Sequence, residues 1–375
     1  MNKLTAFRQQ LHRAAELSGH EQHTAKIITD YLEGLKPDKL ITGIGGHGIA
    51  AIFNGSIDGP RVMIRCDIDA LPITETTDLP YRSENDGAAH KCGHDGHATI
   101  VTGLAEKLSA NRPAKGSVLL LYQPSEENGK GAARVIADSK FKGIEPDIVF
   151  GLHNLPGYPL GDIIVRRGVF ASASTGIRIK LTGKTSHAAE PESGVSPALA
   201  VAQLVQEISA LPQFHTSLHE SAQATIIHAR IGREAFGTSP GDGEVAATLR
   251  SHEQHVIDNM TARAFSIAEG IAKTYGLALE TETVEPFPST VNDDELVTII
   301  EESARAINLK VHHRDIPFPW SEDFGHFTQK YRGAFFGIGS GVDHPVLHHP
   351  DYDFPDALIE PGVAMFSHII KQLLG

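Results

Sequence analysis

The stretch SVLLLYQPSEENG, residues 117–129, begins as an unbroken apolar run and ends in two carboxylates, an amide and a glycine. A short apolar run bounded by turn residues is typical of a buried strand, and such strands belong mainly to α/β sheets that are covered by helices. In these sheets, binding and catalytic side chains gather at the carboxyl ends of the strands. The stretch therefore predicts an α/β fold with functional groups at Glu126 and Glu127.

Strand and helix patterns alternate on both sides of this run. The expected helices cover residues 23–35, 98–108 and 132–138, and the expected strands cover residues 48–53, 61–68, 117–122 and 147–152. Buried strands separated by helices indicate a mostly parallel sheet flanked by helices.

The pattern changes between residues 174 and 285. The order there is β-α-β-β-α-β, with strands at 176–182, 224–231, 243–250 and 278–284 and helices at 196–211 and 252–275. This is the order of a ferredoxin-like unit, which has an antiparallel sheet with helices on one face. Residues 294–307, 333–337 and 359–374 resume the first pattern. We therefore expect a discontinuous domain of residues 1–173 and 286–375 with a second domain, residues 174–285, inserted into it.

The composition describes a folded protein with an excess of acidic residues. The chain has 375 residues, of which 41% are hydrophobic, and 33 Lys and Arg against 46 Asp and Glu give a formal net charge of −13. Nucleic acids and anionic membranes require clustered Lys and Arg, and the chain has no basic run. We therefore expect neither as a partner.

The N-terminal sequence and the cysteine count predict a cytoplasmic location. Leu4, Phe7 and Leu11 have helical spacing among polar residues, which indicates a helix rather than a signal peptide. No apolar run reaches the ~20 residues of a membrane span. The two cysteines, Cys66 and Cys92, are fewer than a secreted domain with disulfides usually contains, so we expect both thiols to stay free.

The most specific local signal is AHKCGHDGH, residues 89–97. In an extended segment, residues two apart point to the same side, so Cys92 and His94 can converge on one metal ion. A polar turn with satisfied hydrogen bonds is the alternative interpretation, but so many ionisable groups are rarely there for packing. For His90 and His97 we expect roles behind the ligands or in solvent.

Further candidates follow other predicted strands. Glu126 and Glu127 form either a solvated acidic loop or a pair in which one carboxylate binds metal and the other accepts a proton from water. His153 follows the strand at 147–152, and spacing alone does not choose between His348 and His349 near the C-terminus.

Two acids end the strand at 61–68. Asp67 or Asp69 could orient a metal ligand from behind. Two tetrahedral metal ions require ~8 coordination positions. Five side chains can supply donor atoms: Cys92, His94, Glu127, His153 and one histidine of the C-terminal pair. If the thiolate and a hydroxide each bind both ions, these donors fill all of the positions.

At this point the chain shows a family resemblance, carried by six motifs in one order. They are HKCGHDGH, QPSEENGKGA, GLHNLP, GKTSHAAEPESG, SEDFGHF and LHHPDYDF. Together they resemble the metal-dependent amidohydrolases of peptidase family M20, in the branch of N-acyl-amino-acid and auxin-conjugate hydrolases, and the similarity covers nearly the whole chain.

The resemblance implies two divalent ions and a role for each matched residue. Thiolate and imidazole suit zinc, and the carboxylate and open positions also accept manganese, cobalt or nickel. One ion is held by His94 and His153 and the other by Glu127 and His348, with Cys92 bridging the two and Glu126 acting as the general base. The family pattern L-H-x-P selects His348 over His349.

The resemblance also gives the inserted domain a function as a lid and dimerisation domain. His187 matches a histidine that stabilises the oxyanion in the partner's site, which implies a homodimer. Arg250 matches a strand-end arginine, a side chain that could bind a carboxylate through two hydrogen bonds. The alternative for both is an exposed residue of a sheet. The chain departs from the family at Gly237, where asparagine is common, and at Glu192 and Ser196, which replace a histidine and an aspartate. These differences concern substrate contacts rather than metal ligands.

We therefore predict a hydrolase that cleaves the amide bond of N-acyl or N-aminoacyl amino acids with a water activated by two metal ions. The alternatives are a dipeptidase that uses the same site, and a catalytically silent member that binds a conjugate or metal. Retention of both Glu126 and Glu127 speaks against silence, because a binder has no need of a base.

Overall fold

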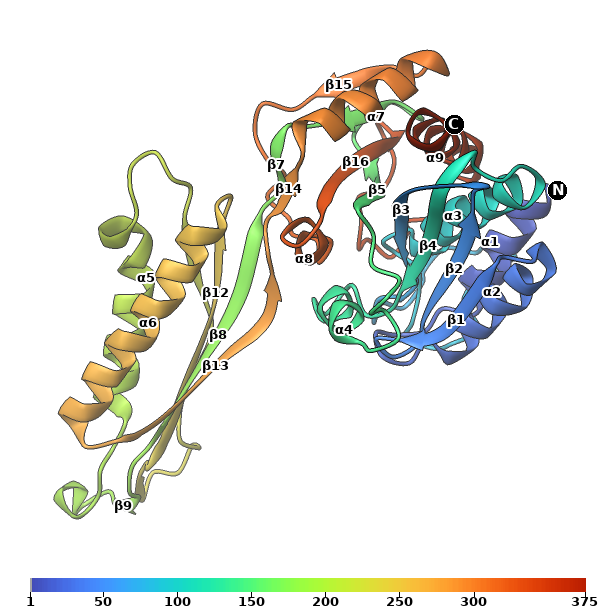
Figure 1. The fold of residues 1–375 in the computed structure, drawn as a ribbon. Helices are drawn as coiled ribbons and strands as arrows, with labels where there is room; N and C mark the ends of the chain where they lie inside the picture. The colour runs from blue at the N-terminus through green and yellow to red at the C-terminus, as the bar shows by residue number, and fades with distance from the viewer. Residues whose placement is uncertain (1) are drawn as a thin grey trace. The chain divides into compact units, whose positions relative to one another are not determined.

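The computed structural model describes residues 2–375 and divides them into two compact units (Figure 1). The first unit contains the residues up to Phe170, Thr290–Pro317 and Glu322–Gly375. The second contains Ala171–Ser289 and the short segment Phe318–Ser321, which the sequence does not assign to it. Within the described part of the chain, no helix combines the length and apolarity needed to cross a membrane.

The first unit is built on an eight-stranded mixed sheet. In spatial order its strands are β1 (Lys39–Ile44), β2 (Gly48–Asn54), β4 (Lys115–Gln123), β3 (Ile57–Asp67), β5 (Ile148–Pro156), β16 (Arg332–Gly341), β6 (Ile163–Val165) and β15 (Val311–His313). The central strands β4, β3, β5 and β16 pair in parallel, whereas β1 with β2, β2 with β4, and β16 with β6 are antiparallel. The α/β class is confirmed, and the parallel pairing that the sequence predicts is found mainly in the centre of the sheet.

Helices cover this sheet and form its core with it. They are α1 (Lys3–Arg13), α2 (Gln22–Leu35), α3 (His94–Ala110), α4 (Gly131–Ala137), α7 (Asp294–Ala306), α8 (Gly325–Thr328) and α9 (Ile359–Leu374), and a short pair, β7 (Gly168–Ala171) with β14 (Thr290–Asn292), completes the unit. Helix α3 packs against α1, α2 and α9. Because α3 is buried along most of its length, its first turn is held rigidly at the end of the sheet.

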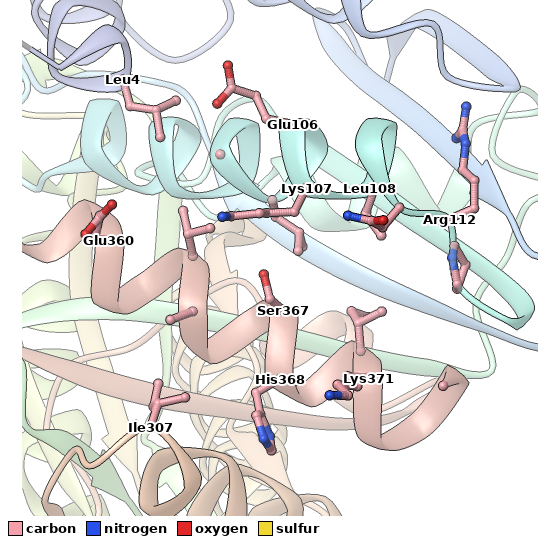
Figure 2. Close-up of a pocket in the computed structure, with 18 of the residues that line it drawn as sticks. Leu4, Glu106, Lys107, Leu108, Arg112, Ile307, Glu360, Ser367, His368 and Lys371 are labelled. Carbon is pink, nitrogen blue, oxygen red and sulfur yellow. The ribbon is translucent and has the colours of Figure 1, made fainter.

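A surface groove of about 910 Å³ runs between α3 and α9 (Figure 2). Leu4 and Leu108 contribute to its apolar lining, and Glu106, Lys107 and Lys371 are among its charged residues. None of the candidate metal ligands lines it.

The second unit has an antiparallel sheet with the order β10-β12-β8-β13. Its elements follow one another as β8 (Ala173–Thr182), α5 (Ala198–His215), β10 (Gln223–Ile231), β12 (Asp242–Ser251), α6 (Gln254–Tyr275) and β13 (Ala278–Phe287). Both helices pack on the sheet and share one apolar core with it. A small ribbon joins β9 (Ser186–His187) to β11 (Thr238–Ser239).

Helix α1 is fixed to the first unit by buried charges as well as by its apolar face. His12 shares hydrogen bonds with Asp95 at 2.8 Å and with Glu75 at 3.0 Å, and Arg8 pairs with Asp95 and with Asp353. Burial opposes the charged form of His12, but the hydrogen bonds to Asp95 and Glu75 outweigh it and raise its pKa to about 9. The imidazolium is therefore the form that the fold stabilises.

This pKa shift predicts a pH dependence of stability. Because the folded pKa of His12 lies above the unfolded value of 6.5, its contribution is fully present below pH ~6.5 and is lost as the pH rises through ~9. We expect His12→Gln to lower the free energy of unfolding by on the order of 3 kcal/mol at pH 6, and the difference from wild type to shrink towards alkaline pH. Urea titrations of chelator-treated protein measure this difference. The exposed His20→Gln is the control, and a wild-type-to-variant difference that does not change across this pH range would contradict the assignment.

Candidate metal centre

The turn that opens α3 places Cys92 and His94 side by side. Gly93 between them has a φ of 92°, and a Cβ at that position would lie 2.4 Å from Asn154 Oδ1. Only glycine tolerates both the left-handed backbone and this close approach. The sequence Cys-Gly-His is therefore a steric requirement of the turn that brings a thiol and an imidazole to the carboxyl end of the sheet.

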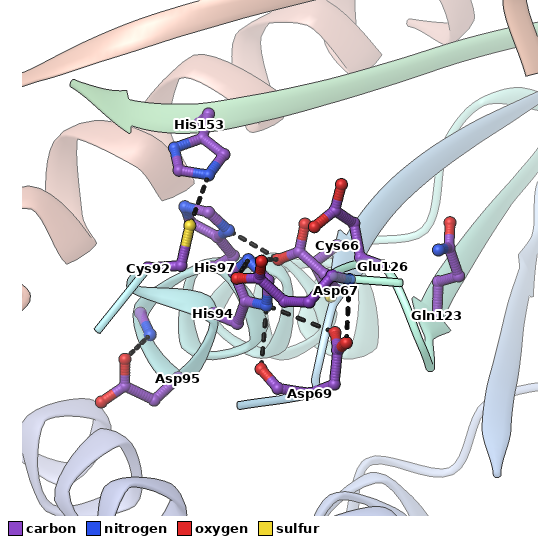
Figure 3. Close-up of polar contacts among 12 residues, drawn as sticks. Cys66, Asp67, Asp69, Cys92, His94, Asp95, His97, Gln123, Glu126 and His153 are labelled. Carbon is purple, nitrogen blue, oxygen red and sulfur yellow. Dashed lines mark hydrogen bonds and ion pairs between the residues drawn. The ribbon is translucent and has the colours of Figure 1, made fainter. Parts of the chain in front are cut away.

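The structure gathers four of the predicted residues around Cys92. Donor atoms of Cys92, His94 and His153 lie within 4.8 Å of one another, and so do those of Cys92, Glu127 and His348. The Cys92 Sγ lies 3.3 Å from His153 Nε2 (Figure 3). The Glu127 Oε1 lies 3.7 Å from His94 Nε2 and 3.8 Å from His348 Nε2. Two three-donor groups thus share one sulfur atom.

These donors come from the turn that opens α3, from two strand ends and from one loop. His153 lies in β5, and Glu127 follows β4. His348 lies in the loop after β16 with a φ of 65°, and its backbone N–H donates to the Lys91 carbonyl at 2.8 Å. His349 accepts a hydrogen bond from the Asp351 N–H instead and belongs to neither donor group.

Hydrogen bonds at Nδ1 of two of the histidines direct Nε2 of each ring towards the donor cluster. His94 Nδ1 lies 2.9 Å from the Asp69 carbonyl oxygen, and His153 Nδ1 lies 2.8 Å from the Asn154 carbonyl oxygen. A carbonyl can only accept, so each Nδ1 carries the proton, and in the neutral ring Nε2 presents its lone pair to the cluster. This is the arrangement of a ligand histidine.

Unsatisfied buried atoms test whether the cluster fits a metal. His94 Nε2 and Glu127 Oε1 are buried and have no hydrogen-bond partner among the described residues. Burial would lower the pKa of His94, but Asp67, Asp69 and Glu127 outweigh it and raise it to about 10. The cluster thus stabilises positive charge. Thiolate, imidazole and carboxylate are together a donor set that divalent transition metals bind, so the residues fit the group.

Two acids at and just after the end of β3 lie next to His94 and Glu127. Asp69 accepts hydrogen bonds from the Glu127 N–H at 3.0 Å and from the Ser18 hydroxyl at 2.7 Å. Asp67 Oδ1 lies 2.6 Å from His97 Nδ1 (Figure 3). Both acids are fully buried, and their contacts hold the ligand-bearing backbone in place.

Glu126 lies within 4.8 Å of donor atoms of His94 and Glu127 and also joins a second buried group of acids. Its carboxylate lies with those of Glu322 and Asp323, and its Oε1 accepts a hydrogen bond from the Asp323 N–H at 3.3 Å. Arg65 pairs with Asp323 at 2.7 Å and with Glu322 at 3.1 Å. Burial and the neighbouring Glu322 and Glu127 carboxylates raise the pKa of Glu126 well above its usual range. A carboxyl group with a raised pKa is suited to accept and return a proton.

Sequence reasoning gave no role to Arg65, Glu322 or Asp323. The motif SEDFGHF contains both acids, but their partner Arg65 lies 258 positions away from Asp323 in the sequence. The acidic pair in this motif was a signal for such a partner, because two acids that become buried require a cation near them.

Lys91 joins the Cys92 turn to the loop that carries His348. Its side chain is fully buried and donates to Glu75 and to the Tyr352 carbonyl, at 2.5 and 2.8 Å. Its own carbonyl accepts the His348 N–H.

A solvent role for the other two histidines of the motif is wrong, because His90 and His97 are both buried. Burial excludes water from them, and His97 bonds Asp67 instead.

The remaining two predicted residues belong to the second unit. His187 is exposed on β9, opposite Thr238, and its Nδ1 accepts the Ala189 N–H at 3.1 Å. Arg250 lies near the end of β12 and makes only long contacts, 3.3 Å to the Pro319 carbonyl and 3.4 Å to the Ser321 hydroxyl. The ribbon that carries His187 also includes the Gly237 carbonyl, which accepts the Ala188 N–H.

The chain is similar along its whole length to two deacetylases of Bacillus subtilis (strain 168). It is 30% identical over 377 residues to an N-acetyl-L-cysteine deacetylase, covering 99% of this chain and 88% of that protein. It is also 30% identical over 373 residues to an N-acetylcysteine deacetylase, covering 99% and 97%.

A solved structure and a family match agree with these relatives. The crystal structure of a dinuclear metal binding peptidase from the M20 family of Bacillus subtilis superimposes with a TM-score of 0.83 at 28% identity, covering 99% of this chain and 97% of that one. Residues 63–372 match peptidase family M20/M25/M40. The chain therefore belongs to peptidase family M20/M25/M40.

Proposed function

We propose that the protein is a metal-dependent amidohydrolase that releases an amino acid from its N-acyl conjugate. The observation that carries this proposal is the pair of three-donor groups that share Cys92, with the additional carboxylate of Glu126 beside them. His94 and His153 would hold one ion, and Glu127 and His348 the other. The names of the two Bacillus deacetylases support an N-acyl amino acid as the substrate class.

The reaction requires a base, a proton donor and stabilisation of the oxyanion. Bound divalent ions would lower the pKa of a water molecule and polarise the substrate carbonyl. Glu126 accepts the proton of the attacking water and returns it to the leaving nitrogen. The Asp323 N–H orients Glu126, and Arg65 limits the charge repulsion among the three acids around it. The products are a carboxylate and a free amino acid.

The proposal gives the second unit the role of a lid and dimerisation domain, residues 174–285. His187 stabilises the oxyanion in the site of the partner subunit, and Arg250 binds the substrate carboxylate. Strand β10 supports a homodimer because it is an edge strand with an exposed apolar residue, Ile227, which is 64% exposed. Zinc is the expected metal, with manganese, cobalt and nickel as alternatives. Cytoplasmic location would keep Cys92 reduced for metal binding.

A mixed substrate library tests the reaction class. We expect protein reconstituted with zinc or manganese to release amines from N-acyl amino acids, and chelator-treated protein to release none. Mass spectrometry identifies the released amines. Release from free dipeptides alone would overturn the N-acyl assignment in favour of a dipeptidase, and tight metal binding without any release would favour the silent member.

Substitutions separate the base from the ligands. Glu126→Gln should lower kcat by about a thousandfold while leaving the metal content intact, because it removes the proton acceptor but none of the proposed metal ligands. Cys92→Ala should lose both metal and activity. Metal analysis and kinetics on the same samples measure this, with the exposed Glu269→Gln as the control. Full activity of Glu126→Gln would remove it as the base.

Mixed dimers test the role of His187. His187→Ala should lower kcat by about 100-fold and spare metal binding, since an oxyanion donor is lost and no ligand is touched. Purified heterodimers of His187→Ala with Glu126→Gln subunits should regain one of the two sites, about half of the wild-type activity, because each intact group then comes from a different subunit. Heterodimers no more active than either variant homodimer would place His187 in its own subunit's site.

A further inference from the structure

A buried serine with a left-handed backbone precedes the two carboxylates of the candidate site. Among residues 2–375, five residues other than glycine have a positive φ, and four of them are exposed. The fifth is Ser125, which has a φ of 58° and is only 1% exposed. Residues with a Cβ rarely adopt this conformation, because the Cβ then crowds the backbone. Contacts with the rest of the fold must therefore hold Ser125 in place.

Glu21 supplies these contacts. Its Oε1 accepts hydrogen bonds from the Ser125 N–H at 2.9 Å and from the Ser125 hydroxyl at 3.2 Å. The same oxygen accepts the Gly19 N–H at 2.8 Å, and the Glu21 side chain is fully buried. Because three donors meet at one acceptor atom away from water, that atom fixes the Ser125 backbone relative to the loop before α2.

The loop that ends at Glu21 also supports the other side of the acidic pair. Its Ser18 hydroxyl donates to Asp69 Oδ2 at 2.7 Å, and the same oxygen accepts the Glu127 N–H at 3.0 Å. The loop between α1 and α2 therefore reaches the backbone before Glu126 through Glu21 and the backbone after it through Asp69.

The conformation of Ser125 decides where the next carboxylate lies. The Glu126 carboxylate lies with that of Glu322, whereas the Glu127 carboxylate joins the donor group of Cys92. Rotation of the Ser125 backbone would displace Glu126, and a displacement of about 1 Å is enough to slow a reaction strongly. The position of the proposed base thus depends on a conformation that Ser125 does not favour by itself.

We propose that Glu21 is a positioning residue for the base. It holds Ser125 in the left-handed conformation, and through Ser125 it keeps the Glu126 carboxylate where it accepts the proton. The inference rests on the proposed amidohydrolase function, to which it adds a residue outside the metal centre. Glu21 acts through its acceptor oxygen and takes no part in proton transfer.

Three substitutions separate the acceptor oxygen of Glu21 from its charge. Glu21→Gln keeps an oxygen on a side chain of the same length, so kcat should stay within about twofold of wild type. Glu21→Asp keeps the charge but is one methylene shorter, and Glu21→Leu has no acceptor. Both should lower kcat by about tenfold and leave KM and metal content unchanged, because the base is displaced and no metal ligand is removed. Kinetics on an N-acyl amino acid and metal analysis measure this, with the exposed Glu33→Gln as the control.

The pattern of losses tests the assignment. Wild-type kcat in Glu21→Asp, or equal losses in Glu21→Gln and Glu21→Leu, would overturn the proposal. A second background keeps the test independent of the Leu variant. Glycine adopts the left-handed conformation without strain, so Glu21→Asp should lower kcat less in Ser125→Gly protein than in wild type. Equal losses in the two backgrounds would contradict the positioning role.

Hydrogen exchange separates this inference from the function on which it rests. In chelator-treated protein, Glu21→Asp should speed amide exchange in residues 124–129 by about tenfold and leave α9 unchanged, because the Ser125 N–H loses its acceptor. Glu21→Gln should exchange like wild type. Unchanged exchange in Glu21→Asp would contradict the positioning role even if the wild-type protein is a hydrolase. Faster exchange without any hydrolysis by the wild type would contradict the amidohydrolase and leave the hold of Glu21 on Ser125 standing.

Discussion

Excess buried negative charge at the carboxyl end of the central sheet is the constraint on which the rest of the site depends. Asp67, Asp69 and Glu126 are buried there with few cations to balance them, and a buried charge without a partner is costly. Arg65 balances one part of this group, and the acids around His94 raise the pKa of its imidazole. The fold tolerates such a cluster because divalent ions would supply the missing positive charge, so that metal binding and stability of this region are linked.

Much of the first unit follows from its sequence, because continuous apolar runs and helical spacing are local signals. The helix expected at 359–374 is observed as Ile359–Leu374, and the strand at 48–53 as Gly48–Asn54. The short strands β1, β6 and β15 were missed. Each has at most six residues, and their place in the sheet depends on neighbours rather than on their own pattern.

The candidate site also contains some residues that local sequence identifies and others that it does not. Cys92 and His94 could be singled out because two donors at that spacing, with glycine between them, are a local pattern. The spacing of residues could not distinguish His348 from His349. The position of His348 depends on its left-handed backbone and on its hydrogen bond to Lys91. Arg65 and its acids form a contact between distant segments. The acidic pair in the sequence indicates that a cation is needed, but the sequence does not identify Arg65 as that cation.

The route of the chain between the two units has a mechanical consequence. The segment Phe318–Ser321 is bonded to the start of β8, yet the next residue, Glu322, belongs to the first unit and lies beside Glu126. The backbone before Glu322 is therefore held in the second unit only two residues away, which limits the positions open to the Glu322 carboxylate beside Glu126.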